Sequence, residues 1–144
     1  MKRSLEMPTE ERDPRDGKQA VVLDSFAWIE YFNGTNAGEK VQSFLETGRA
    51  LTPAIVVAEL SEKHRRLNRE FGPKYDFVKA RTSVVPLEEE LARVAGELNF
   101  DRKKTVKGWG MADSIVLATA RQSKSIIVTG DSHFKDLTEE TILL

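Results

Sequence analysis

The sequence contains no cysteine, which excludes disulfide bonds, thiolate metal ligands and cysteine nucleophiles. It also lacks a long hydrophobic run, since no apolar stretch approaches the ~20 residues that a membrane-spanning helix needs. The N-terminal residues carry no apolar segment of the kind found in secretory signals. We therefore expect a cytoplasmic protein with no membrane partner.

The chain has no excess of either charge. It has 22 lysine and arginine residues against 23 aspartate and glutamate residues, a formal net charge of -1. Any affinity for nucleic acid must therefore come from local groups of basic side chains. His64 and His133 are too few and too scattered for a histidine-based metal site, and His133, close to Asp131, is only a weak candidate for a catalytic histidine. No glycine-rich or Walker-type phosphate-binding loop occurs.

The composition divides the chain into two parts. Residues 1–18 are rich in charges of both signs and contain proline and glycine but few apolar residues. Such a segment cannot bury enough surface to offset the entropy lost on ordering, so we predict a flexible N-terminal extension. Residues 19–144 are long enough for one domain with a single hydrophobic core.

Within residues 19–144, short apolar runs alternate with longer amphipathic stretches. Residues 20–23 and 125–129 are rich in β-branched side chains, as in strands that are buried on both faces of a parallel sheet. Weaker strands are expected at residues 50–51, 82–85 and 142–144, helices at 26–32, 38–46, 53–70, 74–80, 87–98 and 111–123, and a polar connection at 99–110. This alternation predicts an α/β fold with a mostly parallel central sheet and helices on both faces.

Four acidic residues stand within or directly after apolar sequence. Asp24 and Asp131 follow the two strongest strands, so we expect both at the same edge of the sheet. Glu59 and Asp113 lie in expected helices, next to residues that those helices would bury. A carboxylate near a core is destabilising unless it is paired, hydrogen-bonded or bound to a cation. The four could therefore converge on one cleft that holds Mg²⁺ or Mn²⁺, which prefer oxygen ligands.

Each acid also has an ordinary structural explanation. Asp24 could cap a helix, Asp113 could be a first-turn acid favoured by the helix dipole, and Asp131 could be a turn residue. Glu59 could pair with Lys63, one helical turn later. The occurrence of all four in apolar sequence favours a shared site over four separate explanations.

Two basic stretches could draw an RNA to an acidic cleft through phosphate contacts that are sensitive to salt and indifferent to sequence. The candidates for these contacts are Arg65, Arg66, Arg69, Lys103, Lys104 and Lys107. A solvated helix face and a charged loop are equally good explanations of these stretches. Trp109 could stack on an unpaired base, but a packing role is favoured, and the aromatic residues of 26–32 are expected in the core or a dimer interface.

Four segments resemble motifs of the PIN domain family, in the order in which that family has them. Residues 22–29 resemble the opening strand, which ends in Asp followed by Ser or Thr. Residues 58–60 resemble the helical Glu segment, and residues 112–120 the third acidic segment. Residues 128–134 resemble the Thr-x-Asp-x-x-Phe ending, so the resemblance covers about residues 20–144.

The resemblance implies a three-layer α/β/α fold and a ribonuclease that uses one or two Mg²⁺ or Mn²⁺ ions. The residues that match the catalytic and metal-binding positions are Asp24, Glu59, Asp113 and Asp131. Ser25 and Thr129 match polar positions that hold carboxylates or water. The compact length further resembles VapC-type toxins of toxin–antitoxin pairs, which implies a homodimer and a small antitoxin partner. Residues 1–18 depart from that pattern, because such toxins begin almost at the first strand.

Three alternatives remain. The first is a housekeeping RNA-processing or quality-control nuclease of the same family, and the second is a catalytically silent PIN-like binding module. The third is a phosphotransfer or phosphatase domain with Asp24 as the nucleophile. Phe26 argues against the phosphatase form, because it stands where a second aspartate would be needed.

Overall fold

The computed structural model describes residues 19–144, so the extension predicted for residues 1–18 lies outside the described residues. Within that part of the chain, the strands form one parallel sheet of order β3-β2-β1-β4-β5. The strands are β1 (Val21–Leu23), β2 (Ala50–Pro53), β3 (Ser83–Val85), β4 (Ile126–Thr129) and β5 (Thr141–Leu143). The predicted α/β fold with a parallel sheet is confirmed.

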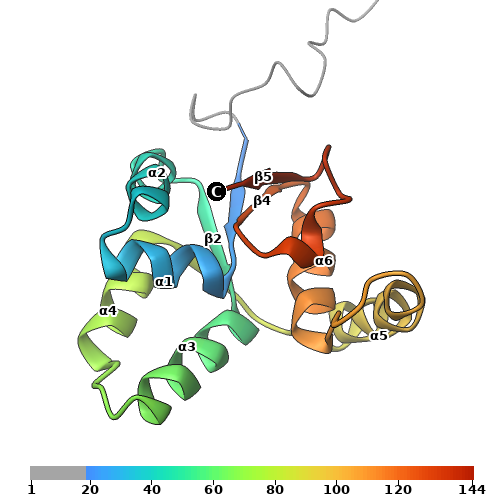
Figure 1. The fold of residues 1–144 in the computed structure, drawn as a ribbon, viewed down its shortest axis with the longest axis horizontal. Helices are drawn as coiled ribbons and strands as arrows, with labels where there is room; N and C mark the ends of the chain where they lie inside the picture. The colour runs from blue at the N-terminus through green and yellow to red at the C-terminus, as the bar shows by residue number, and fades with distance from the viewer. Residues whose placement is uncertain (1–18) are drawn as a thin grey trace, which may run out of the picture.

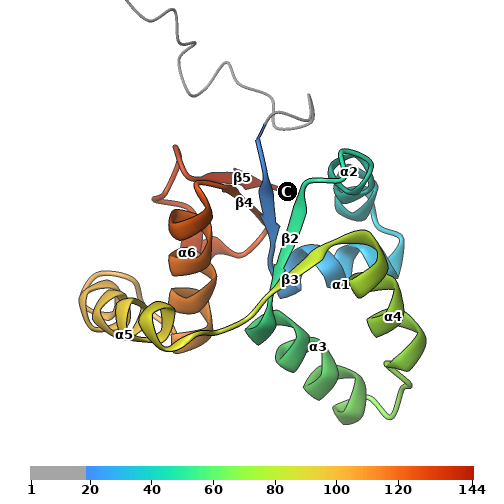
Figure 2. The ribbon, with the colours of Figure 1, turned by 180° about the vertical axis from the view of Figure 1, so that it is seen from behind.

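Helices cover both faces of this sheet, with α1, α2 and α4 on one side and α5 and α6 on the other (Figure 1). The view from behind shows the same two groups, with α3 running away from the end of β2 (Figure 2). The helices are α1 (Ser25–Asn33), α2 (Asn36–Leu45), α3 (Ala54–Arg66), α4 (Gly72–Arg81), α5 (Glu89–Lys103) and α6 (Met111–Ser123), with a short 3-10 turn η3 (Ser132–Phe134). No helix of the described residues is long and apolar enough to cross a membrane.

The core lies between the helices and the two central strands. All three residues of β1 are fully buried, and Ile127 and Val128 of β4 are fully buried beside them. Trp28 of α1 is also fully buried, and it stacks on Phe32 at 5.3 Å between ring centroids. Trp28, Tyr31 and Phe32 thus contribute to the core, one of the two roles expected for the aromatic residues of this helix, whereas Phe26 is 38% exposed.

The bounds of α3 and α5 differ most from the prediction. The helix expected over residues 53–70 ends at Arg66, because Asn68 adopts a left-handed conformation with a φ of 54°, which a helix cannot contain. Pro53 belongs to β2 and precedes the helix. Helix α5 runs on to Lys103, so the first part of the connection expected at 99–110 is helical. Its last turn is largely exposed, and an exposed turn leaves no apolar pattern to detect.

Candidate metal centre at the carboxyl edge of the sheet

The two central strands bring Asp24 and Asp131 to one edge of the sheet. Strands β1 and β4 are parallel neighbours, with Leu23 paired to Val128. Asp24 directly follows β1 and Asp131 follows β4 by two residues, so both leave the sheet at its carboxyl edge. This is the edge at which open parallel sheets form their sites.

Asp24 is buried, with only 5% of its surface exposed. One carboxylate oxygen accepts a hydrogen bond from the Ala27 amide at 2.9 Å and caps helix α1, while the other accepts one from the Thr129 hydroxyl. Burial raises the pKa of Asp24 to about 7, and the charges of Asp131 and Glu59 raise it further against the effect of the two hydrogen bonds. Asp24 therefore caps its helix and also lies within electrostatic reach of the other acids.

Glu59 projects from the first half of α3. Burial raises its pKa, the Ser25 side chain opposes this, and the charges of Asp113 and Asp131 add to the rise. Within residues 19–144, Glu59 forms no ion pair with Lys63, which was the ordinary explanation for an acid at this position. The sensitivity of Glu59 to Asp113 and Asp131 places it in the same group of carboxylates.

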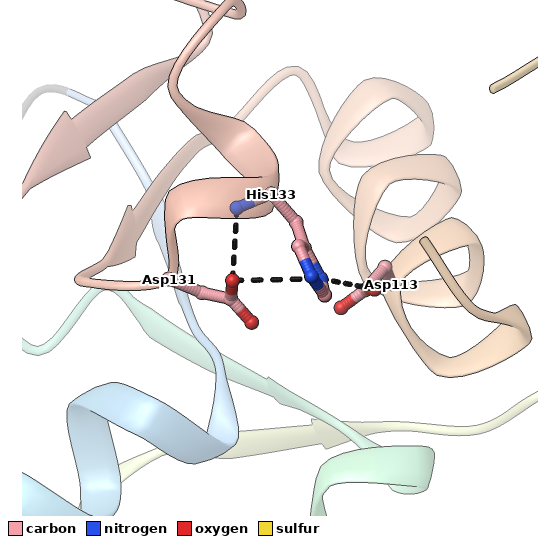
Figure 3. A group of neighbouring side chains, drawn as sticks. All are labelled: Asp113, Asp131 and His133. Atoms are coloured by element: carbon pink, nitrogen blue, oxygen red, sulfur yellow. Dashed lines mark hydrogen bonds and ion pairs between the residues drawn. The ribbon is translucent and has the colours of Figure 1, made fainter. Parts of the chain in front are cut away.

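Asp113 and Asp131 meet on either side of a histidine ring (Figure 3). Asp113 lies in the first turn of α6, where one oxygen, Oδ2, accepts hydrogen bonds from the Gly110 amide and from the His133 Nδ1 atom, both at 3.1 Å. Asp131 caps the η3 turn, and its Oδ1 accepts a hydrogen bond from the His133 amide at 2.9 Å. The His133 Nδ1 atom lies 3.5 Å from the same Oδ1 atom.

The four acids lie near enough to act on one another, because Asp131 and Glu59 raise the pKa of Asp24, and Asp113 and Asp131 raise the pKa of Glu59. Within the described part of the chain, neither Asp113 Oδ1 nor Asp131 Oδ2 accepts a hydrogen bond. Candidate donor atoms of Asp113, Asp131 and His133 lie within 4.8 Å of one another. Carboxylate oxygens without a protein donor at this spacing fit Mg²⁺ or Mn²⁺, because such cations prefer oxygen ligands.

The two polar helpers expected from the sequence also lie at this site. The fully buried Thr129 donates its hydroxyl hydrogen to Asp24 and accepts a hydrogen bond from the Asp131 amide at 3.0 Å. Ser25 lowers the pKa of Glu59. Thr129 thereby links two of the four acids, one from each central strand.

His133 also belongs to this group, although the sequence offered it only as a weak candidate for a catalytic histidine. Its only visible signal is the spacing Asp131-Ser132-His133, which allows a capped tight turn to bring the imidazole back over the first aspartate. The other histidine, His64, lies in a different place. It is buried, donates from Nδ1 to the Leu60 carbonyl at 2.7 Å and packs on Phe71.

The basic candidates for RNA contacts are exposed and lie in two groups. Arg65, Arg66 and Arg69 surround the end of α3, and Lys103, Lys104 and Lys107 surround the end of α5. A surface pocket of about 450 Å³ lies beside the first group, and none of the four carboxylates lines it. Trp109, in contrast, is buried against Phe134 and donates its indole hydrogen to Ser114 at 2.7 Å, so the favoured packing role is confirmed.

Comparison with solved structures finds the same fold in several proteins. A toxin–antitoxin complex from Klebsiella pneumoniae contains a chain with 15% identity and a TM-score of 0.68, over 85% of this chain and 96% of that one. A chain of VapBC2 from Rickettsia felis bound to a DNA fragment from their promoter has 16% identity and a TM-score of 0.68, over 87% of this chain and 97% of that one. A chain of FitAcB from Neisseria gonorrhoeae has 21% identity and a TM-score of 0.55, over 86% of this chain and 96% of that one. At these identities the likeness establishes the fold alone.

The sequence itself decides the family. No curated protein matches the chain. The PIN domain family, however, matches residues 21–140, which include strands β1 to β4, helices α1 to α6 and all four acids of the site. The protein belongs to the PIN domain family.

Proposed function

We propose that this PIN domain is an endoribonuclease that depends on Mg²⁺ or Mn²⁺. The observation that carries the proposal is the convergence of Asp24, Glu59, Asp113 and Asp131 from four separate elements on one edge of the sheet. Burial and mutual repulsion raise the pKa values of Asp24 and Glu59, and a bound cation would remove that repulsion. A purely structural role would not require four acids at one point.

Each acid has a distinct part in the proposed site. Asp113 and Asp131 would hold one or two cations through the oxygens that accept no hydrogen bond, and Glu59 would be a further ligand. Asp24, held by Thr129 and Ala27, would add a fourth carboxylate. When bound, the cation supplies a water acidic enough to ionise near neutral pH and stabilises charge on phosphate oxygens.

The protein groups orient the reactants around that water. The Ser25 side chain lowers the pKa of Glu59 and so favours its carboxylate form, which would accept a hydrogen bond from the attacking water. Asp24 is an unsuitable nucleophile, because it is buried and both of its oxygens accept hydrogen bonds. This argues against the phosphotransfer alternative.

The substrate would be held by its backbone. Exposed arginines at the end of α3 and lysines at the end of α5 provide positive charge that the carboxylates themselves lack. Contacts of this kind position a phosphate chain without reading its bases. We propose Arg65, Arg66, Arg69, Lys103, Lys104 and Lys107 for this role.

We further propose that the protein is the toxin of a toxin–antitoxin pair, works as a homodimer and is inhibited by a small antitoxin. Its support is the fold shared with the toxin–antitoxin complex, VapBC2 and FitAcB structures named above. A neighbouring reading frame for a short protein that restores growth when the chain is expressed would agree with the toxin role. Normal growth on expression of the active chain alone would favour the housekeeping nuclease.

Cleavage of a labelled, structured RNA pool tests the nuclease activity. The wild-type protein should cut with Mg²⁺ or Mn²⁺ and stop when EDTA is added. Asp24→Asn and Asp113→Asn should each lower the rate by at least ~100-fold, since each alters a carboxylate of the site. Asp101→Asn is the matched control, because Asp101 is exposed on α5 and should leave the rate unchanged. Equal cutting by all variants would indicate a contaminating nuclease, and the silent binding module would become the better proposal.

A further inference from the structure

His133 is held on every side by groups that belong to different elements. Its amide donates to Asp131, and its Nδ1 atom donates to Asp113 at 3.1 Å, since an ionised carboxylate can only accept. On the far side of the ring, Gly108 comes so close that a Cβ atom there would lie 2.9 Å from Nε2. Glycine also permits the φ of 83° that brings this loop against the ring.

The carbonyl of His133 is held by Arg102, which lies in the last turn of α5. Arg102 donates to that carbonyl at 3.2 Å and forms a two-pronged pair with Asp136, at 2.7 and 3.0 Å. Its guanidinium lies 4.2 Å from the centre of the Trp109 ring, and its side chain is only 13% exposed. Arg102 directly precedes two of the lysines proposed to contact RNA, but its side chain is largely buried, whereas that of its neighbour Lys103 is exposed.

The Arg102 contacts are more than a surface ion pair. Its Nε atom is buried and has no hydrogen-bond partner in the described residues, which is destabilising for a guanidinium. The protein retains this unfavourable burial, and the other nitrogens of Arg102 hold the turn that carries Asp131 and His133. It therefore connects the end of α5 to the start of α6 through the histidine ring.

The hydrogen bonds of His133 decide which carboxylate oxygens remain available. Asp113 receives both of its donors on Oδ2, and Asp131 receives its donor on Oδ1. Asp113 Oδ1 and Asp131 Oδ2 therefore stay without a donor from residues 19–144. Fixing one oxygen of each carboxylate orients the other, as outer-sphere hydrogen bonds do for metal ligands in general.

From this geometry we infer that His133 is a positioning residue of the metal centre, acting through its Nδ1–H bond to Asp113, and that Arg102 positions His133. The inference rests on the proposed metal-dependent function. It adds two residues that neither the acidic quartet nor its polar helpers include. It also distinguishes Arg102, whose largely buried side chain contacts the His133 carbonyl, from the exposed lysines proposed to contact RNA.

The test is the affinity for Mn²⁺ alone, measured from the electron paramagnetic resonance signal of free Mn²⁺ during titration. His133→Asn places an amide N–H at the same bond separation from Cβ as Nδ1, whereas His133→Gln places it one bond further. We expect His133→Asn to bind within about 3-fold of wild type and His133→Gln to bind about 10- to 100-fold more weakly. Arg102→Lys should weaken binding in the same direction, because lysine lacks the planar guanidinium that pairs with both Asp136 oxygens and still reaches the His133 carbonyl.

Arg93→Lys is the matched control for Arg102→Lys. Arg93 also lies on α5 and pairs with two carboxylates, Glu90 and Glu97, but it is exposed and far along the helix from His133. Its substitution should leave Mn²⁺ affinity unchanged. Thermal unfolding without metal shows whether each variant folds, so that a loss of affinity is not read from an unfolded protein.

The outcomes separate the inference from the proposed function. Wild-type affinity for Mn²⁺ in His133→Gln would overturn the positioning role. An equal loss of affinity in His133→Asn and His133→Gln would overturn it too, because the imidazole itself would then be required. Wild-type affinity in Arg102→Lys would show that Arg102 does not position His133. If the wild-type protein binds no Mn²⁺, the proposed metal centre fails, and the inference fails with it.

Discussion

Asp24 occupies an unfavourable position for a charged side chain. It is buried, and its pKa is raised to about 7 from an ordinary value of 3.8. In the unfolded chain the carboxyl group ionises near pH 4, but in the folded protein it ionises only near pH 7. Stability from the neutral form is therefore present at low pH and is lost as the pH rises through about 7.

Substitution of Asp24 by asparagine should stabilise the metal-free protein above pH 7. Asparagine cannot ionise, and its carbonyl oxygen can still accept the hydrogen bond from Ala27. The free energy of unfolding at pH 8 should rise by up to about 4 kcal/mol, which is the pKa difference converted to energy, less whatever is lost at Thr129. At pH 3, where the carboxyl group is neutral in both the folded and the unfolded chain, the two proteins should differ little. Urea unfolding in EDTA at both pH values measures this.

Asp101→Asn again serves as the control, because that carboxylate is exposed and its substitution should change stability at neither pH. An Asp24→Asn protein no more stable than wild type at pH 8 would show that burial does not destabilise the charged form. The raised pKa would then be no evidence for a site that awaits a cation.

At the residue scale, the sequence singled out the four acids as candidates because each stands within or directly after apolar sequence, a pattern that is visible without a structure. It gave His133 only as a weak catalytic candidate, because nothing in a linear sequence shows that a turn folds an imidazole back between two carboxylates. The inward orientation of Arg102 was equally hidden, since its sequence neighbours are basic and most of them are exposed.

At the element scale, helices α1 and α2 pack closely because of one glycine. A Cβ atom at Gly38 would lie 2.2 Å from the carbonyl oxygen of Glu30, which is backbone and cannot move aside alone. Gly38 itself is buried. The two helices can therefore approach to this distance only with glycine at position 38.

Gly38→Ala should destabilise the protein by at least about 2 kcal/mol, because the added methyl group must push α2 away from α1. The matched control is Gly96→Ala in α5, where a Cβ atom would meet nothing within 4 Å. That change should stabilise the helix by about 0.5–1 kcal/mol, because alanine loses less backbone entropy than glycine. Thermal unfolding of the two variants should therefore move in opposite directions. If Gly38→Ala unfolds at the wild-type temperature, the close helix contact is wrong.

The sequence predicted fully buried elements correctly, but it did not predict the exposed ends of two helices. Strands β1 and β4 stood out because every residue in them is buried. The end of α5 was taken for a connection, because Phe100 and its neighbours face solvent and show no apolar periodicity. The end of α3 depends on the left-handed backbone of Asn68, which no pattern of hydrophobicity reports.

At the scale of the whole molecule, a net charge of -1 conceals a separation of charge. The acids lie at the carboxyl edge of the sheet, and exposed basic residues follow the ends of α3 and α5. Arg49 and Lys124, in contrast, precede β2 and β4 at the opposite edge. The affinity for a polyanion such as RNA should therefore depend on these particular basic residues and not on the total number of basic residues.

Removal of the proposed phosphate-binding side chains should weaken RNA binding and its dependence on salt. The triple substitution of Lys103, Lys104 and Lys107 by glutamine should lower the slope of log affinity against log salt by about 1 for each phosphate that is no longer neutralised. The same is expected for Arg65, Arg66 and Arg69. The control is the triple substitution of Lys40, Arg49 and Lys124, which changes the net charge equally.

Fluorescence anisotropy of labelled RNA in EDTA, where cleavage does not occur, gives these slopes. Equal decreases in all three triple variants would mean that only the total charge matters. The proposed RNA-binding residues would then have to be withdrawn.

The order of the strands is what the sequence alone could not provide. Alternating strands and helices predict a parallel sheet, but they do not show that β1 and β4, more than 100 residues apart along the chain, lie side by side. That pairing brings Asp24 next to Thr129 and Asp131, so the convergence of the site is a property of the whole fold. The residue pattern indicated that the four acids could converge on one cleft, and the resemblance to PIN domains implied the same, but neither gave the strand order.

The central claim is that a cation held by these carboxylates makes water the nucleophile that cuts RNA. Mass spectrometry of the fragment ends from wild-type and Asp113→Asn reactions tests it most directly. Attack by water leaves a phosphate monoester on one fragment and a hydroxyl group on the other. We predict only these ends, formed by the wild type with Mg²⁺ or Mn²⁺ and absent with Asp113→Asn. Ends with a 2′,3′-cyclic phosphate, or the same products in EDTA, would contradict the claim, because the RNA's own hydroxyl group would then be the nucleophile or the cation would be unnecessary.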